Sequence, residues 1–274
     1  MSLKLHVLDT GYTTAIEGAI IKGGRLRKIV CHSLVGLLLH PEYGPILFDT
    51  GYAPRILAAS RRFPYRLYRW VTPLHVTPEG AVAAQLPRFG LTADDIRYVI
   101  LSHFHADHVA GLRDFPRARL IAKGSGYEDV SRRRGWRAVL KGFLPALMPP
   151  DFRSRAILLP DFAGHALPGL GPTHSLFGDP SLQLVDLPGH ARGQIGLLAA
   201  TGSGRVLLAA DGCWMLKQVR ERRPPHPITG IIVDDMAAVR STIDNLHAFA
   251  QACPDVRIIP CHCPEAYARE VEPA

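Results

Sequence analysis

Residues 96–111 read IRYVILSHFHADHVAG, an apolar run followed by three histidines and an aspartate within six positions. The apolar run predicts a buried strand. Side chains two apart in an extended segment point the same way, so His103 and His105 can reach one ion together. Asp107 and His108 follow where the chain turns toward a helix, and this turn directs their side chains to a second position beside the first ion. The stretch therefore predicts side chains for two metal ions about 3.5–4 Å apart, the separation typical of two-metal hydrolases.

The same arrangement recurs three times further along the chain. Short apolar runs at 182–190 (LQLVDLPGH), 205–211 (RVLLAAD) and 256–262 (VRIIPCH) each end in a residue that can bind metal, namely His190, Asp211 and His262. Four buried strands that carry such residues at their carboxyl ends predict an α/β sheet with a site along one edge.

Composition and length indicate a globular chain with a sizeable core. The 274 residues are 47% hydrophobic and 20% charged, which is typical of folded proteins. The first residues lack the apolar segment of a signal peptide, and no apolar run approaches the roughly 20 residues that span a bilayer. The five cysteines are an odd number, which favours reduced thiols over a disulfide framework. We therefore expect a soluble, cytoplasmic protein without a membrane span.

The remaining pattern predicts one domain over residues 1–274. Segments 3–11 and 34–52 are expected to form strands, and Thr92 with Asp95 has the spacing of a capping box. Residues 80–90 are expected to form a helix that Pro87 interrupts and Gly90 ends. Between about 124 and 180 the strand pattern lapses, which predicts a basic insert of loops over the site, with a helix at 130–148.

The motifs HFHADH, LPGH, AAD and PCH, in that order, resemble those of the metallo-β-lactamase superfamily, whose signature is H-x-H-x-D-H. The resemblance runs from about residue 30 to 265 and includes GPILFDTG at 44–51. It implies an α/β fold, a four-layer αββα sandwich, with the site along one edge.

The resemblance also implies a ligand set and roles. His103, His105 and His190 would hold the first metal, Asp107, His108 and His262 the second, and Asp211 would bridge the two, with Asp107 and Asp211 as catalytic groups. Imidazole and carboxylate ligands suit zinc, while iron, manganese or cobalt can occupy such a set.

Three further residues have two interpretations each. Asp49, in FDTG, either orients a ligand histidine, as the resemblance implies, or only forms a turn. Cys261 and Cys263 flank His262. In an extended segment their side chains point away from that histidine, which favours buried free thiols over a thiolate site.

The implied reaction uses a metal-bridging hydroxide to open an ester-type bond, and the N-acyl homoserine lactonase group is the most similar in pattern. Two positions depart from it. Trp214 stands three residues after Asp211, where those lactonases usually carry a substrate-binding tyrosine, and Gln194 replaces the last histidine of PGHxxGH. We expect a dinuclear metal-dependent hydrolase, a lactonase with Trp214 at its substrate. The alternatives are a thioesterase of glyoxalase II type, a β-lactam hydrolase, or a non-enzymatic metal-binding scaffold.

Two arginine clusters, at 55–69 and 132–141, contribute to a net charge of +8. The clusters can be solvated faces of helices. Alternatively, they can bind nucleic acid, anionic lipid or an acidic substrate. We expect a small-molecule substrate, amphiphilic or anionic, that enters past these clusters, and no nucleic-acid partner. A nucleic-acid-binding protein is the remaining non-enzyme alternative. Surface aromatic residues leave a homodimer open.

Overall fold

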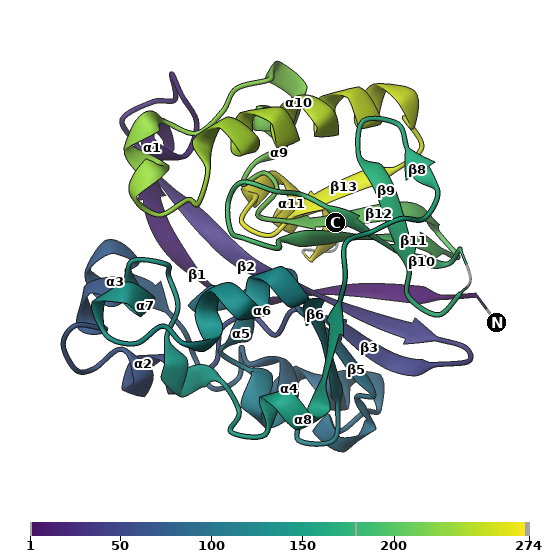
Figure 1. The fold of residues 1–274 in the computed structure, drawn as a ribbon, viewed down its shortest axis with the longest axis horizontal. Coiled ribbons are helices and arrows are strands. Elements are labelled where there is room, and N and C mark those ends of the chain that lie inside the picture. The colour runs from purple at the N-terminus through teal and green to yellow at the C-terminus, as the bar shows by residue number, and fades with distance from the viewer. Residues whose placement is uncertain (1, 179, 272–274) are drawn as a thin grey trace.

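The computed structural model describes residues 2–178 and 180–271. Two β-sheets pack face to face and helices cover their outer faces, which gives four layers (Figure 1). The prediction of an αββα sandwich is therefore confirmed.

The first sheet has the strand order β4-β1-β2-β3-β5-β6-β7. The bounds of its strands are β1 Lys4–Ile16, β2 Lys28–His40, β3 Gly44–Phe48, β4 Leu74–His75, β5 Tyr98–Ile100, β6 Arg119–Lys123 and β7 Ala156–Leu159. The second sheet has the order β13-β12-β11-β10-β9-β8. Its strands are β8 Ala166–Leu167, β9 Gly171–Ser175, β10 Leu182–Asp186, β11 Ile195–Thr201, β12 Gly204–Ala210 and β13 Arg257–Pro260.

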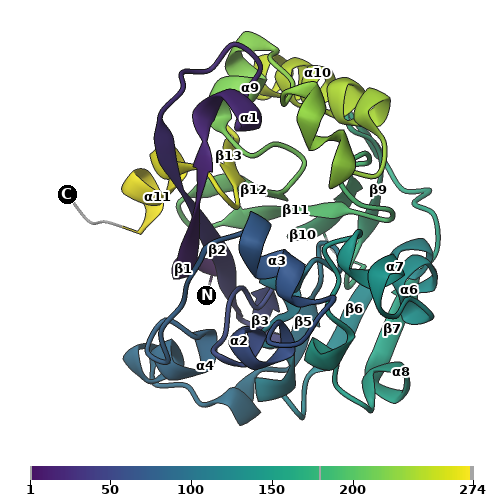
Figure 2. The ribbon, with the colours of Figure 1, turned by 90° about the vertical axis from the view of Figure 1, so that its left-hand side faces the viewer.

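Helices lie on both outer faces. Those on the side of the first sheet are α2 Arg55–Ala59, α3 Arg66–Val71, α4 Val82–Gln85, α5 Ala106–Val109, α6 Gly124–Ser131, α7 Trp136–Val139 and α8 Phe152–Arg155. Those associated with the second sheet are α9 Leu216–Glu221, α10 Met236–Ala252 and α11 Pro264–Glu270. The helix α1 Glu17–Ile20 lies near the tip of the β1–β2 hairpin (Figure 2). Short 3-10 turns are η1 Leu86–Phe89, η2 Ala93–Asp95, η3 Leu112–Asp114, η4 Pro145–Leu147 and η5 Pro227–Ile231.

The strand β2 shows why its sequence is apolar at consecutive positions. Leu34 and Leu38 point into the core between the sheets, whereas Val35 and Leu37 point into the core beneath the helices. Successive side chains of a strand alternate between its faces, so a strand buried on both faces needs an unbroken apolar run.

Parallel strand pairs bring the predicted ligands to one edge. In the first sheet β3 pairs with β5 in parallel, and in the second β12 pairs with β13 in parallel. The carboxyl ends of the strands in each pair therefore meet, and the loops after them carry Asp49, His103, Asp211 and His262.

Several local predictions are confirmed. Segments 3–11 and 34–52 contain β1, β2 and β3, and the Thr92 amide donates to the Asp95 carboxylate at 2.8 Å. Over 80–90 the chain forms α4 and then η1, and it ends at Gly90 with φ of 70°. The 3-10 geometry of η1 accommodates Pro87.

The helix predicted over 130–148 is wrong. Between Arg132 and Met148 only the four residues of α7 are α-helical. Gly135 and Gly142 adopt positive φ of 55° and 59°, outside the helical region, and Pro145 begins a 3-10 turn instead. One domain with an insert at 124–180 stays a prediction. That segment supplies β7 to the first sheet and β8 and β9 to the second.

Candidate metal centre

The loops after four strands carry seven predicted ligands to one place. His103, His105, Asp107 and His108 follow β5, His190 follows β10, Asp211 follows β12 and His262 follows β13. The helix α5 begins at Ala106, so the chain turns between His105 and Asp107 as the spacing predicted. The structure thus brings together residues that are up to 159 positions apart.

A first group of three histidines forms one half of the site. One ring nitrogen from each of His103, His105 and His190 lies within 4.8 Å of the others. His105 Nδ1 and His190 Nε2 are 2.8 Å apart. The Nδ1 of His103 faces the Ser102 hydroxyl at 2.9 Å, which leaves its Nε2 for the site. This trio is the set that the sequence assigned to a first metal.

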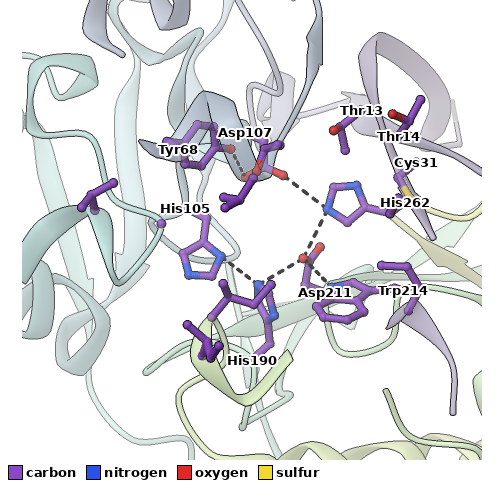
Figure 3. A pocket seen from close by; sticks show the side chains of 18 of the residues that line it. Thr13, Thr14, Cys31, Tyr68, His105, Asp107, His190, Asp211, Trp214 and His262 are labelled. Atoms are coloured by element: carbon purple, nitrogen blue, oxygen red, sulfur yellow. Dashed lines mark hydrogen bonds and ion pairs between the residues drawn. The ribbon is translucent and has the colours of Figure 1, made fainter. Parts of the chain in front are cut away.

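A second group lies beside it. Ligand atoms of His108, Asp211, Cys261 and His262 lie within 4.8 Å of one another, and Asp107 Oδ2 is 3.3 Å from His262 Nε2. Asp211 Oδ2 is 3.2 Å from His262 Nε2 and 3.1 Å from His190 Nε2 (Figure 3). One carboxylate oxygen therefore contacts a histidine of each group, which is the position that a bridging ligand occupies.

Asp49 holds one of these histidines in place. Its Oδ2 is 2.8 Å from His108 Nδ1, and its carboxylate accepts from the Ser102 amide and hydroxyl at 2.8 and 2.7 Å. A carboxylate on Nδ1 fixes the tautomer and directs Nε2 toward the site. Asp49 lies at a φ of 64°, so it turns the chain as well. Both sequence interpretations therefore apply to the same residue.

Replacing Asp49 by Asn is expected to weaken metal binding about 10- to 100-fold, since the residues behind metal ligands contribute that much to affinity. The amide keeps the shape but loses the charge that faces His108. Competition against a chromophoric chelator measures the change. Asp255→Asn is the matched control, because Asp255 pairs with Arg205 on the surface. An unchanged metal affinity in Asp49→Asn would contradict the orienting role and leave Asp49 only its role in the turn.

Burial and neighbouring charges set the protonation of the site. Burial lowers the pKa of His105 to about 3, and it lowers the pKa of His103 and His190 as well. Burial opposes ionisation of Asp211, but the charges of His262 and His190 outweigh it, and the pKa of Asp211 falls well below its usual range. Neutral His103, His105 and His190 with an ionised Asp211 are the forms that bind metal. Against burial, the charge of Asp49 raises the pKa of His108 and that of Asp211 raises the pKa of His262.

Buried atoms without partners test whether a metal fits. Among the described residues, His103 Nε2, His108 Nε2, His190 Nδ1 and Asp211 Oδ1 are buried without a hydrogen-bond partner. Two of them, His108 Nε2 and Asp211 Oδ1, face each other at 3.4 Å. An unsatisfied buried polar group costs about 1–3 kcal/mol, and coordination of a cation would satisfy the imidazole Nε2 atoms and the carboxylate oxygen. The site therefore suits divalent metal ions.

Five of the seven predicted ligands form the floor of an apolar cavity of about 370 Å³, namely His105, Asp107, His190, Asp211 and His262. Side chains of the β1–β2 hairpin, α3, α7 and η5 form its walls, including Ile20, Leu67, Val71, Leu140 and Ile231. Cys31 also lines it, and burial raises the pKa of this thiol to about 11, so it stays protonated. A pocket with a polar floor and apolar walls matches an amphiphilic molecule.

Trp214 lines the cavity but has its only donor engaged. The indole N–H donates to Asp211 Oδ2 at 2.9 Å, and the ring lies edge-on to His190.

Tyr68, which the sequence analysis did not single out, also lines the cavity and donates from its hydroxyl to Asp107 Oδ1 at 3.4 Å (Figure 3). No local motif marks Tyr68, because α3 reaches the site only through the packing of the chain.

The prediction that Cys261 points away from the site is wrong. Alternation holds only within a strand, and β13 ends at Pro260. Cys261 lies in the following turn, and its Sγ lies near the second group of ligands. Cys263 does point elsewhere, and its sulfur accepts from the Leu216 amide at 3.4 Å.

Comparisons with known proteins agree with this geometry. An N-acyl homoserine lactonase named AttM, from Azorhizobium caulinodans, is 26% identical over 84% of this chain and 81% of its own. An N-acyl homoserine lactonase from Bacillus cereus is 28% identical over 68% of this chain and 66% of its own. A solved N-acyl homoserine lactone hydrolase, with the product N-hexanoyl-L-homoserine bound at its catalytic metal center, superposes with a TM-score of 0.74. It is 22% identical, and the match covers 98% of this chain and 97% of that one.

A second solved structure, of the dizinc quorum-quenching lactonase AidC, superposes with a TM-score of 0.68 at 17% identity, over 96% of this chain and 88% of that one. These two likenesses establish the fold. The sequence profile of the Metallo-beta-lactamase superfamily matches residues 30–262, which include the whole ligand set. The chain therefore belongs to the metallo-β-lactamase superfamily.

Proposed function

We propose that the protein is a dinuclear metal-dependent hydrolase that opens the ester bond of a lactone with an apolar substituent. One observation carries this proposal: a cluster of His and Asp side chains reaches, through His105, Asp107, His190, Asp211 and His262, the floor of a cavity whose walls are apolar. The relatives whose names state lactonase activity support the lactone.

The two groups of ligands assign the metal sites. We assign His103, His105 and His190 to one cation, and Asp107, His108 and His262 to the other, with Asp211 shared. Bound cations supply Lewis-acid activation of a carbonyl and of water. Zinc suits these ligands, as do iron, manganese and cobalt, and the dizinc relative favours zinc.

We assign the proton transfer to Asp107. Its Oδ2 faces His262 Nε2 at 3.3 Å and its Oδ1 accepts from Tyr68. Burial opposes ionisation, but the charges of His108 and His262 prevail and lower the pKa of Asp107. The ionised carboxylate lines the cavity, where Oδ2 can accept a proton from the attacking water and deliver it to the departing alcohol oxygen.

We assign the binding of the substrate carbonyl to Tyr68. Trp214 cannot do so, because its N–H is already donated to Asp211. The Tyr68 hydroxyl lies 3.4 Å from Asp107, longer than the 2.5–3.0 Å of a good O–H···O bond. This weak contact leaves the hydroxyl able to turn toward a carbonyl. Trp214 then serves as a wall of the cavity and a restraint on Asp211.

Replacing Tyr68 by Phe is expected to lower kcat about 10²- to 10³-fold, the typical loss for one donor to a developing oxyanion. KM should change little, because the hydrogen bond strengthens chiefly in the transition state. Steady-state kinetics on the preferred lactone measure both constants. Tyr127→Phe is the control, since Tyr127 stacks on Phe152 and does not line the cavity. A raised KM at unchanged kcat would contradict this role.

A substrate panel tests the function itself. We expect hydrolysis of N-acyl homoserine lactones to exceed that of a glutathione thioester, a β-lactam and a phosphodiester. Each methylene buried in an apolar cavity contributes about 0.8 kcal/mol, so kcat/KM should rise about fourfold per methylene until the cavity is filled. A preference for the thioester or the β-lactam would keep the metal centre and overturn the lactone assignment. Metal binding without any hydrolysis would favour a scaffold.

Location and assembly complete the proposal. All five cysteines are free, which fits a reducing cytoplasm. No helix in the described part of the chain is both long and apolar enough to cross a bilayer. A homodimer remains a proposal.

A further inference from the structure

Exposed apolar side chains lie on the same segments that form the cavity wall. Among the described residues, the large hydrophobic side chains that remain exposed lie on four segments: Ile16, Leu26 and Val30 on the β1–β2 hairpin, Phe63, Trp70 and Val71 at α3, Trp136 and Leu140 at α7, and Ile228, Ile231 and Ile232 at η5. Each of these four segments also contributes side chains to the cavity wall. Scattered exposed hydrophobic residues are normal, whereas a gathered set marks an interaction site. We call these eleven residues the apolar collar.

The segments of the apolar collar are in contact with one another. The rings of Phe63 and Trp136 meet edge to face, with centroids 4.9 Å apart, and the Gly135 amide donates to the Tyr65 hydroxyl at 2.8 Å. On the other side, the amide of His226, the residue before η5, donates to the Ala19 carbonyl in α1 at 3.1 Å. Figure 2 turns α1, α3 and α7 toward the viewer. The four segments that carry the apolar collar therefore adjoin one another around the cavity.

The same face carries unpaired positive charge. Segments 53–75 and 131–150 contain no acidic residue. Their exposed arginines without a carboxylate at ion-pair distance, within the described ranges, are Arg61, Arg62, Arg66, Arg69, Arg132, Arg134 and Arg137. By contrast, Arg133 pairs with Asp129 and Lys141 with Asp234.

These charges favour an anionic bilayer over a second copy of the chain as the partner of this face. A second copy of the chain would bring seven unpaired arginines against the same seven, which like-charge repulsion disfavours. An anionic bilayer complements them, because each basic residue near such a surface contributes to binding. Tryptophan and aliphatic side chains insert at the boundary between headgroups and acyl chains. Both features of the face therefore fit anionic lipid.

We propose that this face docks on an anionic phospholipid bilayer, with the apolar collar at the headgroup boundary and the arginines on lipid phosphates. The cavity then opens toward the bilayer, so an amphiphilic substrate dissolved there enters without crossing water. The docking itself is independent of the reaction, and only the delivery of substrate rests on the proposed function.

Vesicle sedimentation tests the docking. The holoenzyme should sediment with vesicles of phosphatidylcholine and phosphatidylglycerol, and much less with phosphatidylcholine alone. The double variant Arg66→Glu with Arg69→Glu should bind the anionic vesicles at least about tenfold more weakly. Arg88→Glu with Arg240→Glu is the matched control. Both pairs lower the net charge by four, from +8 to +4, but Arg88 and Arg240 lie on η1 and α10, away from the cavity wall.

A second variant tests the apolar collar. Trp70→Ser with Trp136→Ser should weaken vesicle binding while leaving thermal unfolding unchanged, since both rings are more than half exposed. Equal loss in the Arg88 and Arg240 control, or no sedimentation of the wild type with anionic vesicles, would overturn the proposal. So would a lipid-free dimer in light scattering that the tryptophan variant dissociates, because a second copy would then occupy the face. Hydrolysis of a short-chain lactone in vesicle-free buffer reports separately on the proposed function.

Discussion

Replacing Asp211 by Asn is expected to lower kcat/KM for the preferred substrate on the order of 10³-fold. Asp211 is the residue whose single oxygen Oδ2 contacts both groups of histidines, His190 at 3.1 Å and His262 at 3.2 Å. A metal centre contributes several kcal/mol of transition-state stabilisation, and each 1.36 kcal/mol is tenfold in rate. Loss of the shared carboxylate should also lower the metal content of the purified protein.

Asparagine is preferred to alanine at this position because it keeps the volume and an oxygen for the Trp214 indole N–H. Circular dichroism verifies that the variant folds. Asp244→Asn is the control, since Asp244 pairs with Arg222 on the surface. Wild-type kcat/KM in Asp211→Asn would show that the site does not use a shared carboxylate.

Stripping the metal is expected to lower the melting temperature on the order of 10 °C. The site buries four histidines and two carboxylates with several unpartnered atoms, so the metal-free protein carries polar groups that have lost water and gained no partner. A ligand present at about 1,000 times its Kd stabilises by about 4 kcal/mol. For chains of about 150–250 residues each kcal/mol is worth about 2–4 °C, and this chain of 274 residues lies just above that range.

Differential scanning calorimetry of chelator-treated protein, before and after zinc is restored, measures this shift. Asp211→Asn provides the control, because its shift on adding zinc should be much smaller. An identical melting temperature with and without zinc in the wild type would contradict the fit of a metal to these residues.

The sequence predicts which residues come together at the site because their positions follow strand ends. A buried strand has a readable apolar run, and the residue after it must lie at the sheet edge. The runs before His103, His190, Asp211 and His262 therefore locate the site with no knowledge of the rest of the fold. His105 and Asp107 follow from spacing within one turn.

The parts that the sequence missed depend on contacts between distant segments. Tyr68 reaches Asp107 from a helix 39 positions earlier, and no periodicity reports such a contact. Cys261 was misplaced because alternation was extended beyond Pro260, where the strand ends. The helix expected at 130–148 failed because Gly135 and Gly142 take positive φ, which composition alone does not reveal.

Trp214 shows a third kind of limit. The sequence identifies the substitution of tryptophan for the tyrosine of similar lactonases. The sequence does not reveal whether the indole N–H points at substrate or at a neighbouring carboxylate, because small differences in side-chain position decide this. In the structure the N–H donates to Asp211. Under the proposed function, the donor role therefore falls to Tyr68, which lines the same cavity.

Elemental analysis of protein purified under reducing conditions without chelator tests the dinuclear centre most directly. The two groups of ligands predict about two divalent metal ions per chain, and they predict that Asp211→Asn retains fewer. Wild-type protein that folds, contains no stoichiometric metal and takes none up from zinc-containing buffer would contradict the account.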